Sequence, residues 1–178
     1  MFEGLLLGDS VVVWDVEQAR ELYRLGFYGK PLGIPKPKDL NFDAPLVLDL
    51  VEALYLARQR RLRILRGDLE VSPEEFEGYA ASVEPNFPTK YRVYADLRDR
   101  GFVVLPGIKF GSDFAVYRHG PGIDHAPFII QIKKGDEKLS ALEIIRAGRL
   151  ATSVKKHFTI SVPAGDKVVY LMFEWWRA

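Results

Sequence analysis

The first part of the chain alternates short apolar runs with segments that have helical spacing. Two strands are predicted over 4–7 and 11–14, because both runs are apolar and a Gly-Asp-Ser turn joins them. A helix is expected from Asp15 to a stop at Gly26. A second helix is expected after Asp43, and a third over 73–82. The apolar stripe of the second helix would be Leu46, Leu50, Ala53, Leu54 and Ala57.

The second part of the chain reads as one helix followed by several strands. The helix is expected to run to about Arg100, with its aromatic and leucine positions turned inward at Tyr91, Tyr94 and Leu97. A capping box at 140–143 predicts another helix to about residue 155. Its apolar stripe would be Leu142, Ile145, Leu150 and Val154. Strands are predicted over 102–106, 113–118, 127–134, 157–163 and 167–176.

This mixture of elements predicts an α/β fold, of mixed α+β character, in two domains. The Pro-Asn-Phe-Pro segment at 85–88 is the best candidate for the boundary. We therefore expect a small N-terminal α/β domain over 1–84 and a C-terminal α/β domain over 85–178, built on a central mixed sheet. Residues 29–38 interleave proline and glycine with lysine, so they are expected to form a surface loop.

Composition restricts the classes of protein only loosely. The chain has no cysteine, which leaves neither disulfides nor a thiolate metal site. No apolar run approaches the ~20 residues of a membrane span, and the first residues lack a signal-peptide pattern, so a cytoplasmic protein without membrane contact is expected. The net charge is only +1, but residues 130–157 contain seven Lys or Arg against three acids. Such a local excess is what contacts with phosphate require.

Three blocks of sequence in the second half carry candidate chemistry. They are Phe-Gly-Ser-Asp-Phe-Ala-Val-Tyr at 110–117, Gly-Pro-Gly-Ile-Asp-His-Ala at 120–126, and Arg-Leu-Ala-Thr-Ser-Val-Lys-Lys at 149–156. In this order they resemble the catalytic domain of archaeal tRNA-splicing endonucleases. The resemblance covers roughly residues 86–178 and is weaker over the N-terminal half. It implies an endonuclease that excises introns from precursor tRNA at bulge–helix–bulge sites.

The resemblance assigns the catalytic roles to Tyr117, His125 and Lys156. RNA can be cut by its own 2′-hydroxyl, which leaves 2′,3′-cyclic phosphate and 5′-hydroxyl ends, and the protein must then move two protons and stabilise charge on the phosphate. His125 is the natural acid because its pKa lies near ~6.5. Lys156 would stabilise the phosphate oxygens. Tyr117 would be the base, and nearby positive charge would favour its phenolate. No metal and no cofactor is expected.

Further residues are expected to bind RNA. Arg149 precedes Lys156 by two helical turns and would share its side of the helix if regular structure persisted. In the resembling family an arginine here holds a bulged base together with a second cationic or aromatic side chain. Trp175 and Trp176 are the candidates for that partner face. The loop over 29–38 resembles an insertion associated in one branch with broader substrate choice.

The apolar end of the chain predicts assembly with other subunits. The strand over 167–176 is long and terminal, so it is expected at a sheet edge, where it invites pairing. The family resemblance implies that this strand joins two subunits and that the loop before it, with Asp166, docks into a partner. The loop over 29–38 resembles that of the family branch in which two catalytic chains assemble with two smaller ones. The resemblance therefore implies a heterotetramer with a smaller non-catalytic subunit, with a homotetramer as second choice.

Two other functions fit parts of the sequence. A metal-dependent nuclease would use Asp113 with the Gln-Ile-Lys segment at 131–133, although a second carboxylate is not evident. A non-catalytic RNA-binding or scaffolding subunit would not need the Tyr, His and Lys set. Cleavage in the presence of a chelator would separate these functions.

Overall fold

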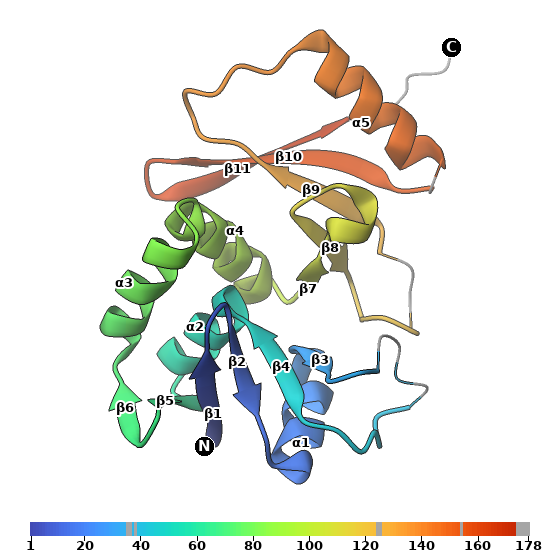
Figure 1. Ribbon diagram of the computed structural model, residues 1–178. Helices are drawn as coiled ribbons and strands as arrows, with labels where there is room; N and C mark the ends of the chain where they lie inside the picture. The colour runs from blue at the N-terminus through green and yellow to red at the C-terminus, as the bar shows by residue number, and fades with distance from the viewer. Residues whose placement is uncertain (35–36, 38, 124–125, 154, 174–178) are drawn as a thin grey trace. The chain divides into compact units, whose positions relative to one another are not determined.

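The computed structural model describes residues 1–34, 37, 39–123, 126–153 and 155–173. The chain divides into two compact units, Met1–Tyr91 and Arg92–Ala178, and each contains one mixed sheet with helices (Figure 1). The predicted fold class, an α/β protein of mixed character, is confirmed. Within the described residues no helix is long and apolar enough to cross a membrane.

The N-terminal unit is built on a six-stranded sheet in the order β3-β4-β2-β1-β5-β6. Only the β1–β5 pair is parallel, and the other pairs are antiparallel. The strands are β1 (Phe2–Leu7), β2 (Ser10–Val13), β3 (Lys30–Pro31), β4 (Leu46–Asp49), β5 (Leu62–Arg66) and β6 (Leu69–Val71). The helices are α1 (Val16–Gly26), α2 (Leu50–Arg58) and α3 (Pro73–Val83).

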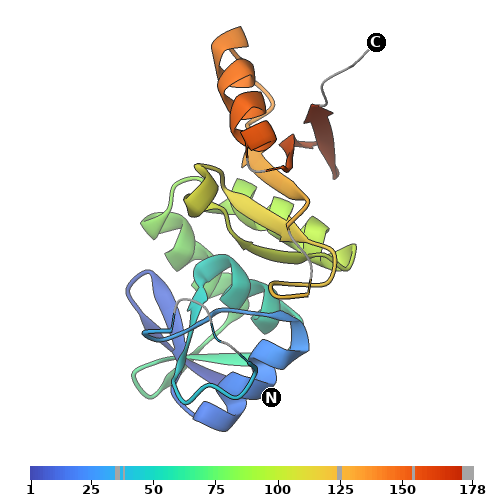
Figure 2. The same cartoon turned by 90° about the vertical axis from the view of Figure 1, so that its right-hand side faces the viewer.

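Local signals explain where these helices begin. Asp15 caps α1 by accepting a hydrogen bond from the Gln18 N–H at 2.8 Å. Ser72 and Glu75 form a capping box at the start of α3, which covers the span predicted over 73–82. α1 packs on β1, β2 and β4, and α2 packs on β2, β4, β5 and α3. Figure 2 shows α1 in blue and α2 in teal beside the strands of this unit.

The expected start of the second helix is wrong. The segment Leu46–Asp49 is the strand β4, which pairs with β2 and β3. Its burial alternates, with Leu46 and Leu48 fully buried and Val47 and Asp49 half-buried, which is the pattern of a strand. The helix begins only at Leu50, because Asp49 and Glu52 form a capping box there.

Glu52 also holds the loop that precedes β3. Its carboxylate is buried and accepts hydrogen bonds from the Gly29 N–H at 3.0 Å and from the Asp49 N–H at 2.9 Å. A Cβ at Gly29 would lie 2.7 Å from the Val47 carbonyl oxygen, and the residue has φ of +70°. Glycine is therefore required where the loop crosses the sheet edge.

The C-terminal unit is built on a five-stranded sheet in the order β11-β10-β9-β8-β7. The β9–β10 pair is parallel and the others are antiparallel, so the predicted mixed sheet is confirmed. The strands are β7 (Val103–Pro106), β8 (Phe114–Tyr117), β9 (Phe128–Ile132), β10 (His157–Ala164) and β11 (Lys167–Phe173). The helical segments are α4 (Phe87–Asp99), which begins in the N-terminal unit, η1 (Ile108–Phe110) and α5 (Ala141–Ser153).

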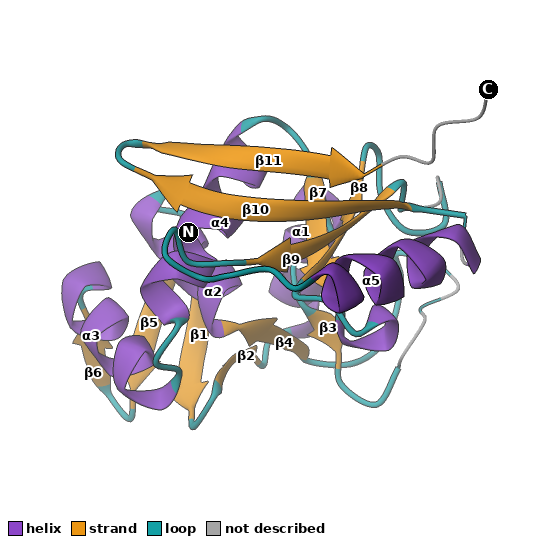
Figure 3. Ribbon diagram, turned by 90° about the horizontal axis from the view of Figure 1, so that it is seen from above, coloured by secondary structure: helices purple, strands orange, loops and turns teal. Residues whose placement is uncertain are grey.

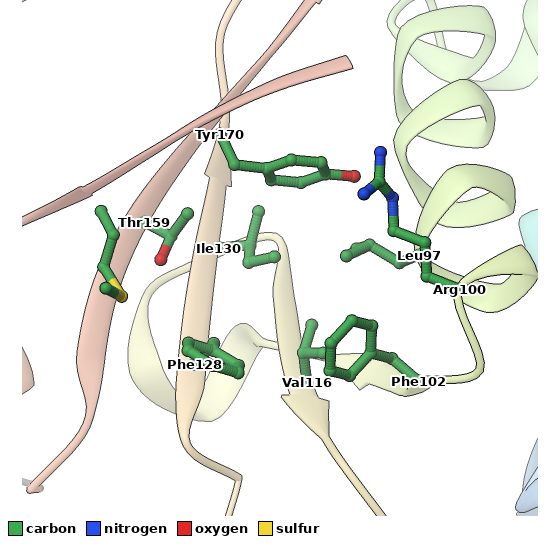
Figure 4. A pocket seen from close by; sticks show the side chains of 9 residues that line it. Leu97, Arg100, Phe102, Val116, Phe128, Ile130, Thr159 and Tyr170 are labelled. Carbon is green, nitrogen blue, oxygen red and sulfur yellow. The ribbon is translucent and has the colours of Figure 1, made fainter. Parts of the chain in front are cut away.

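Different helices pack on the two faces of this sheet. On one face Ile129, Phe158 and Ile160 form a buried cluster, and Ala147 of α5 packs against it. The alternate positions, among them Ile130 and Thr159, lie toward Leu97 of α4 around an apolar pocket of about 190 Å³ (Figure 4). Figure 3 shows α5 alongside β9 and β10.

The apolar stripe of α5 is largely exposed. Leu142, Ile145 and Leu150 are 54%, 45% and 39% exposed, and the helix packs against the buried cluster of the sheet through Ala147. Val154 lies outside the described residues. The helix ends at Ser153, and Lys155 takes a left-handed conformation with φ of 54°.

Candidate active site on the edge of the C-terminal sheet

The sheet topology brings three separate segments to one edge. Tyr117 is the last residue of β8, and Phe128 opens β9, which runs antiparallel to β8. Val116 is paired with Phe128 in this antiparallel pair, so Tyr117 lies opposite position 127. His157 opens β10, which is parallel to β9, and is paired with Phe128. The C-terminal end of β8 and the N-terminal ends of β9 and β10 therefore meet.

Lys156 stands immediately before β10, at this edge. Its ammonium donates a hydrogen bond to the Ala126 carbonyl at 2.6 Å. The backbone continues the connection, since the His157 N–H donates to the Pro127 carbonyl at 2.8 Å. Lys156 is thus tied to the residue that directly follows His125 in the chain. The structure brings together Tyr117, the segment after His125, and Lys156.

The environment of Lys156 favours loss of its proton more than water does. The side chain is half-buried, and this partial burial, followed by the nearby Lys109 ammonium, lowers the pKa of Lys156 below its ordinary value. The centroid of the Phe110 ring lies 5.0 Å from the Lys156 Nζ. Among the residues that the structure describes, no carboxylate is paired with this lysine.

The other predicted site residues are placed differently. His125, Trp175 and Trp176 lie outside the described residues. Arg149 is an exposed residue of α5. It would share a helix side with Lys156 only if the helix continued, and this condition is not met, because α5 ends at Ser153 and Lys155 takes a left-handed conformation.

Asp113, the candidate ligand of a metal-dependent nuclease, has a structural role in the sheet. Its carboxylate accepts a hydrogen bond from the Ile132 N–H at 2.7 Å, which ties the segment before β8 to β9. Lys133 pairs with Glu143 at 3.2 Å and with Glu137 at 3.6 Å. In the described part of the chain, no group of three or more His, Asp or Glu side chains is arranged to hold a metal ion.

Phe110 and Lys109 are the neighbours of Lys156 that sequence reasoning did not assign. Phe110 is the first residue of the first sequence block, and the block assigned it no role of its own. A contact between a ring and a lysine 46 residues later in the chain cannot be predicted from a local pattern. Phe110 also lines a groove of about 210 Å³ between η1, the sheet face and α5.

Comparison with known proteins identifies the family. Residues 87–170 match the model of the tRNA intron endonuclease, catalytic C-terminal domain, and residues 2–77 match the model of the tRNA intron endonuclease, N-terminal domain. The chain is 49% identical to a tRNA-splicing endonuclease of Hyperthermus butylicus over 98% of both chains. It is 45% identical to that of Pyrobaculum islandicum, over 97% of this chain and 98% of the relative, and 38% identical to that of Sulfolobus acidocaldarius, over 98% of both chains. The chain therefore belongs to the tRNA intron endonuclease family.

Proposed function

We propose that the chain excises introns from precursor tRNA by cutting at bulge–helix–bulge sites without a metal ion. Each cut leaves a 2′,3′-cyclic phosphate and a 5′-hydroxyl end. The proposed catalytic domain spans residues 85–178, and residues 1–84 form the N-terminal domain. The observation that supports this chemistry is the meeting of Tyr117, the segment after His125 and Lys156 at one sheet edge.

The three side chains divide the reaction into a base, an acid and a positive charge. Tyr117 takes the proton from the attacking 2′-hydroxyl, and His125 protonates the departing 5′-oxygen. Lys156 stabilises the negative charge that develops on the phosphate oxygens. Its ammonium is bonded to a neutral carbonyl, so its charge is not cancelled and a phosphate can replace that carbonyl as the acceptor.

The chemistry is tested by the ends that the reaction leaves. The purified chain, with any partner subunit it needs, is incubated with an intron-containing precursor tRNA in EDTA, and the fragment ends are analysed by mass spectrometry. We expect cyclic phosphate and 5′-hydroxyl ends at an undiminished rate. Fragments with 5′-phosphate ends, or activity that EDTA abolishes and Mg²⁺ restores, would contradict the proposal.

The residue roles are tested by matched substitutions. His125→Ala is expected to lower the cleavage step by about 10²-fold to 10⁴-fold, the usual contribution of a positioned acid, with RNA binding nearly unchanged. Arg149→Ala is expected to weaken productive binding instead, together with Trp175 or Trp176 on the other side of a bulged base. The exposed His119 is the control, and His119→Ala should cleave normally. A fully active His125→Ala variant would remove the histidine from the mechanism.

Assembly is proposed through the last strand. β11 is the edge of its sheet and exposes Val169, Leu171 and Met172 at 44%, 47% and 50%. An apolar edge of this kind favours pairing with another chain. The proposed assembly is a heterotetramer with a smaller non-catalytic subunit, with a homotetramer as second choice, and the Asp166 turn is the docking loop.

Light scattering after size exclusion tests this assembly, with the chain alone and co-expressed with its candidate partner. A tetramer that contains both chains is expected. A monomer that cuts both splice sites at full rate would exclude assembly as a requirement. An active tetramer of this chain alone would exclude only the second subunit.

A further inference from the structure

The turn that carries Phe110 is held rigidly against the sheet. The Gly107 N–H donates to the Asp113 carbonyl at 2.9 Å, and the Phe110 N–H donates to the Gly107 carbonyl at 2.8 Å. A Cβ at Gly107 would lie 2.7 Å from the Ser112 carbonyl oxygen, and Gly111 has φ of +62°, so both glycines are needed for this geometry. Asp113 then fixes the end of the turn to β9.

The Phe110 ring is therefore held in a fixed direction rather than free to move. It packs against the buried cluster that contains Ile129 and Phe158, and it is itself half-buried. From this position the ring centroid is 5.0 Å from the Lys156 Nζ. This distance is within the range in which the negative face of an aromatic ring attracts an ammonium.

We propose that Phe110 is a positioning residue for Lys156: its ring holds the ammonium at the sheet edge in the charged form, ready to meet the scissile phosphate. The inference rests on the proposed function, because it gives Lys156 a phosphate to meet. An aromatic face suits this task better than a carboxylate. A carboxylate would hold the lysine more strongly, but it would also repel the phosphate and cancel the charge that the reaction uses.

The groups around the lysine make such support necessary. Partial burial and the Lys109 ammonium both act against the charged form of Lys156. The Ala126 carbonyl and the Phe110 ring act in its favour. When a phosphate replaces the Ala126 carbonyl as the acceptor, the ring remains in place, so the lysine keeps one fixed contact throughout the exchange.

The test replaces Phe110 by 3,4,5-trifluorophenylalanine, which keeps the shape of the ring and weakens its negative face, and compares it with Phe110→Leu and Phe110→Tyr. The trifluoro and leucine variants are expected to lower single-turnover cleavage of precursor tRNA by about 5-fold to 30-fold, as for a partly desolvated cation–π contact. Phe110→Tyr should restore most of the rate. In a Lys156→Met background, Phe110→Leu should cause no further loss, because its effect passes through the lysine.

A second measurement follows the lysine without any cleavage. Acylation of Lys156 by acetic anhydride, measured by mass spectrometry across a pH series, reports the pKa of its amine because only the neutral form reacts. The trifluoro variant should lower this pKa and move the alkaline limb of the cleavage profile in the same direction. Lys109→Met should move the labelling pKa in the opposite direction.

The two measurements separate failure of this inference from failure of the proposed function. If the unmodified chain, with its partner subunit, does not cut precursor tRNA, the proposed function fails, and the labelling series still decides whether Phe110 holds the lysine. If the trifluoro variant labels and cleaves like the unmodified chain, the ring has no such role. A labelling shift with unchanged cleavage also overturns the inference, because the contact would then not serve the reaction.

Discussion

Arg92 of α4 holds the turn between β10 and β11, and its removal is expected to loosen that turn. One terminal nitrogen of the guanidinium donates hydrogen bonds to the Gly165 carbonyl and to the Lys167 carbonyl, the latter at 3.0 Å. These carbonyls flank Asp166. Gly165 has φ of 56° in the first position of a two-residue hairpin, which is a conformation that glycine adopts without strain. Arg92→Ala removes both bonds and leaves the strands on either side intact.

The size of the effect follows from these two bonds. A hydrogen bond from a charged donor contributes about 1.5–3 kcal/mol when buried, but the turn is exposed, so about 0.5–1 kcal/mol each is appropriate here. The free energy of local opening should then fall by about 1–2 kcal/mol, which corresponds to about 5-fold to 30-fold faster exchange of the turn amides. The free energy of global unfolding should fall by no more than this amount.

Hydrogen–deuterium exchange of peptides that cover the turn is the assay. We expect faster exchange at 164–168 in Arg92→Ala and unchanged exchange in β9. Asp166→Asn is the matched control, because it removes the acid and leaves the Arg92 contacts in place. If the turn docks into a partner, Asp166→Asn should weaken assembly without faster exchange, whereas Arg92→Ala should do both. Unchanged exchange in Arg92→Ala would refute the reasoning about the turn.

Three further outcomes are expected. The N–H and hydroxyl of Ser140, and then Lys133, lower the pKa of Glu143 to about 2. The stabilisation of α5 by the Glu143 carboxylate should therefore be complete above about pH 4.5 and be lost as the pH falls toward 2. Helicity measured by circular dichroism should lose this acid dependence in Glu143→Gln. Tyr170→Phe removes the 2.6 Å hydrogen bond to Asp96 and should lower the free energy of unfolding by about 1 kcal/mol in urea titrations, and no loss would show that this bond does not anchor β11. Thr159 has a buried hydroxyl without a protein partner within the described residues, so Thr159→Val should keep or raise the melting temperature, and a fall of several degrees would contradict this reading.

Some parts of the fold followed directly from the sequence and others depended on distant contacts. The caps at Asp15 and Ser72 were readable because a helix start is decided by residues three positions apart. The segment from Leu46 was misread because its leucines fit helical spacing as well as alternation, and only the pairing with β2 and β3 decides for a strand. The exposure of the apolar stripe of α5 could not be predicted, because amphipathic spacing shows that a helix has an apolar side and does not show what covers it.

The candidate site was predictable to a similar extent. The sequence blocks singled out Tyr117 and Lys156 as candidates, and the sheet brings both to the edge where β9 begins. The contact of Lys156 with Phe110 could not be predicted, because it depends on the strand register and on the fold of the turn that carries Phe110. Neither can be inferred from a local sequence pattern. The helical relation between Arg149 and Lys156 required a helix that continued to Lys156, whereas α5 ends at Ser153 and Lys155 has a left-handed backbone.

The strand order limits which changes in loop length can alter the distance between Tyr117 and Lys156. Tyr117 ends β8 and Lys156 precedes β10, and β9 lies between these strands. Because neighbouring strands are about 4.8 Å apart, the backbone positions of the two residues are separated by two such steps, about 10 Å, whatever the loops do. The hydrogen-bonded ladder therefore fixes the separation between these two candidate residues. The loop between Tyr117 and the start of β9 can therefore gain or lose residues without changing that span, whereas a slip of one residue in β9 would turn every side chain of that strand to the opposite face.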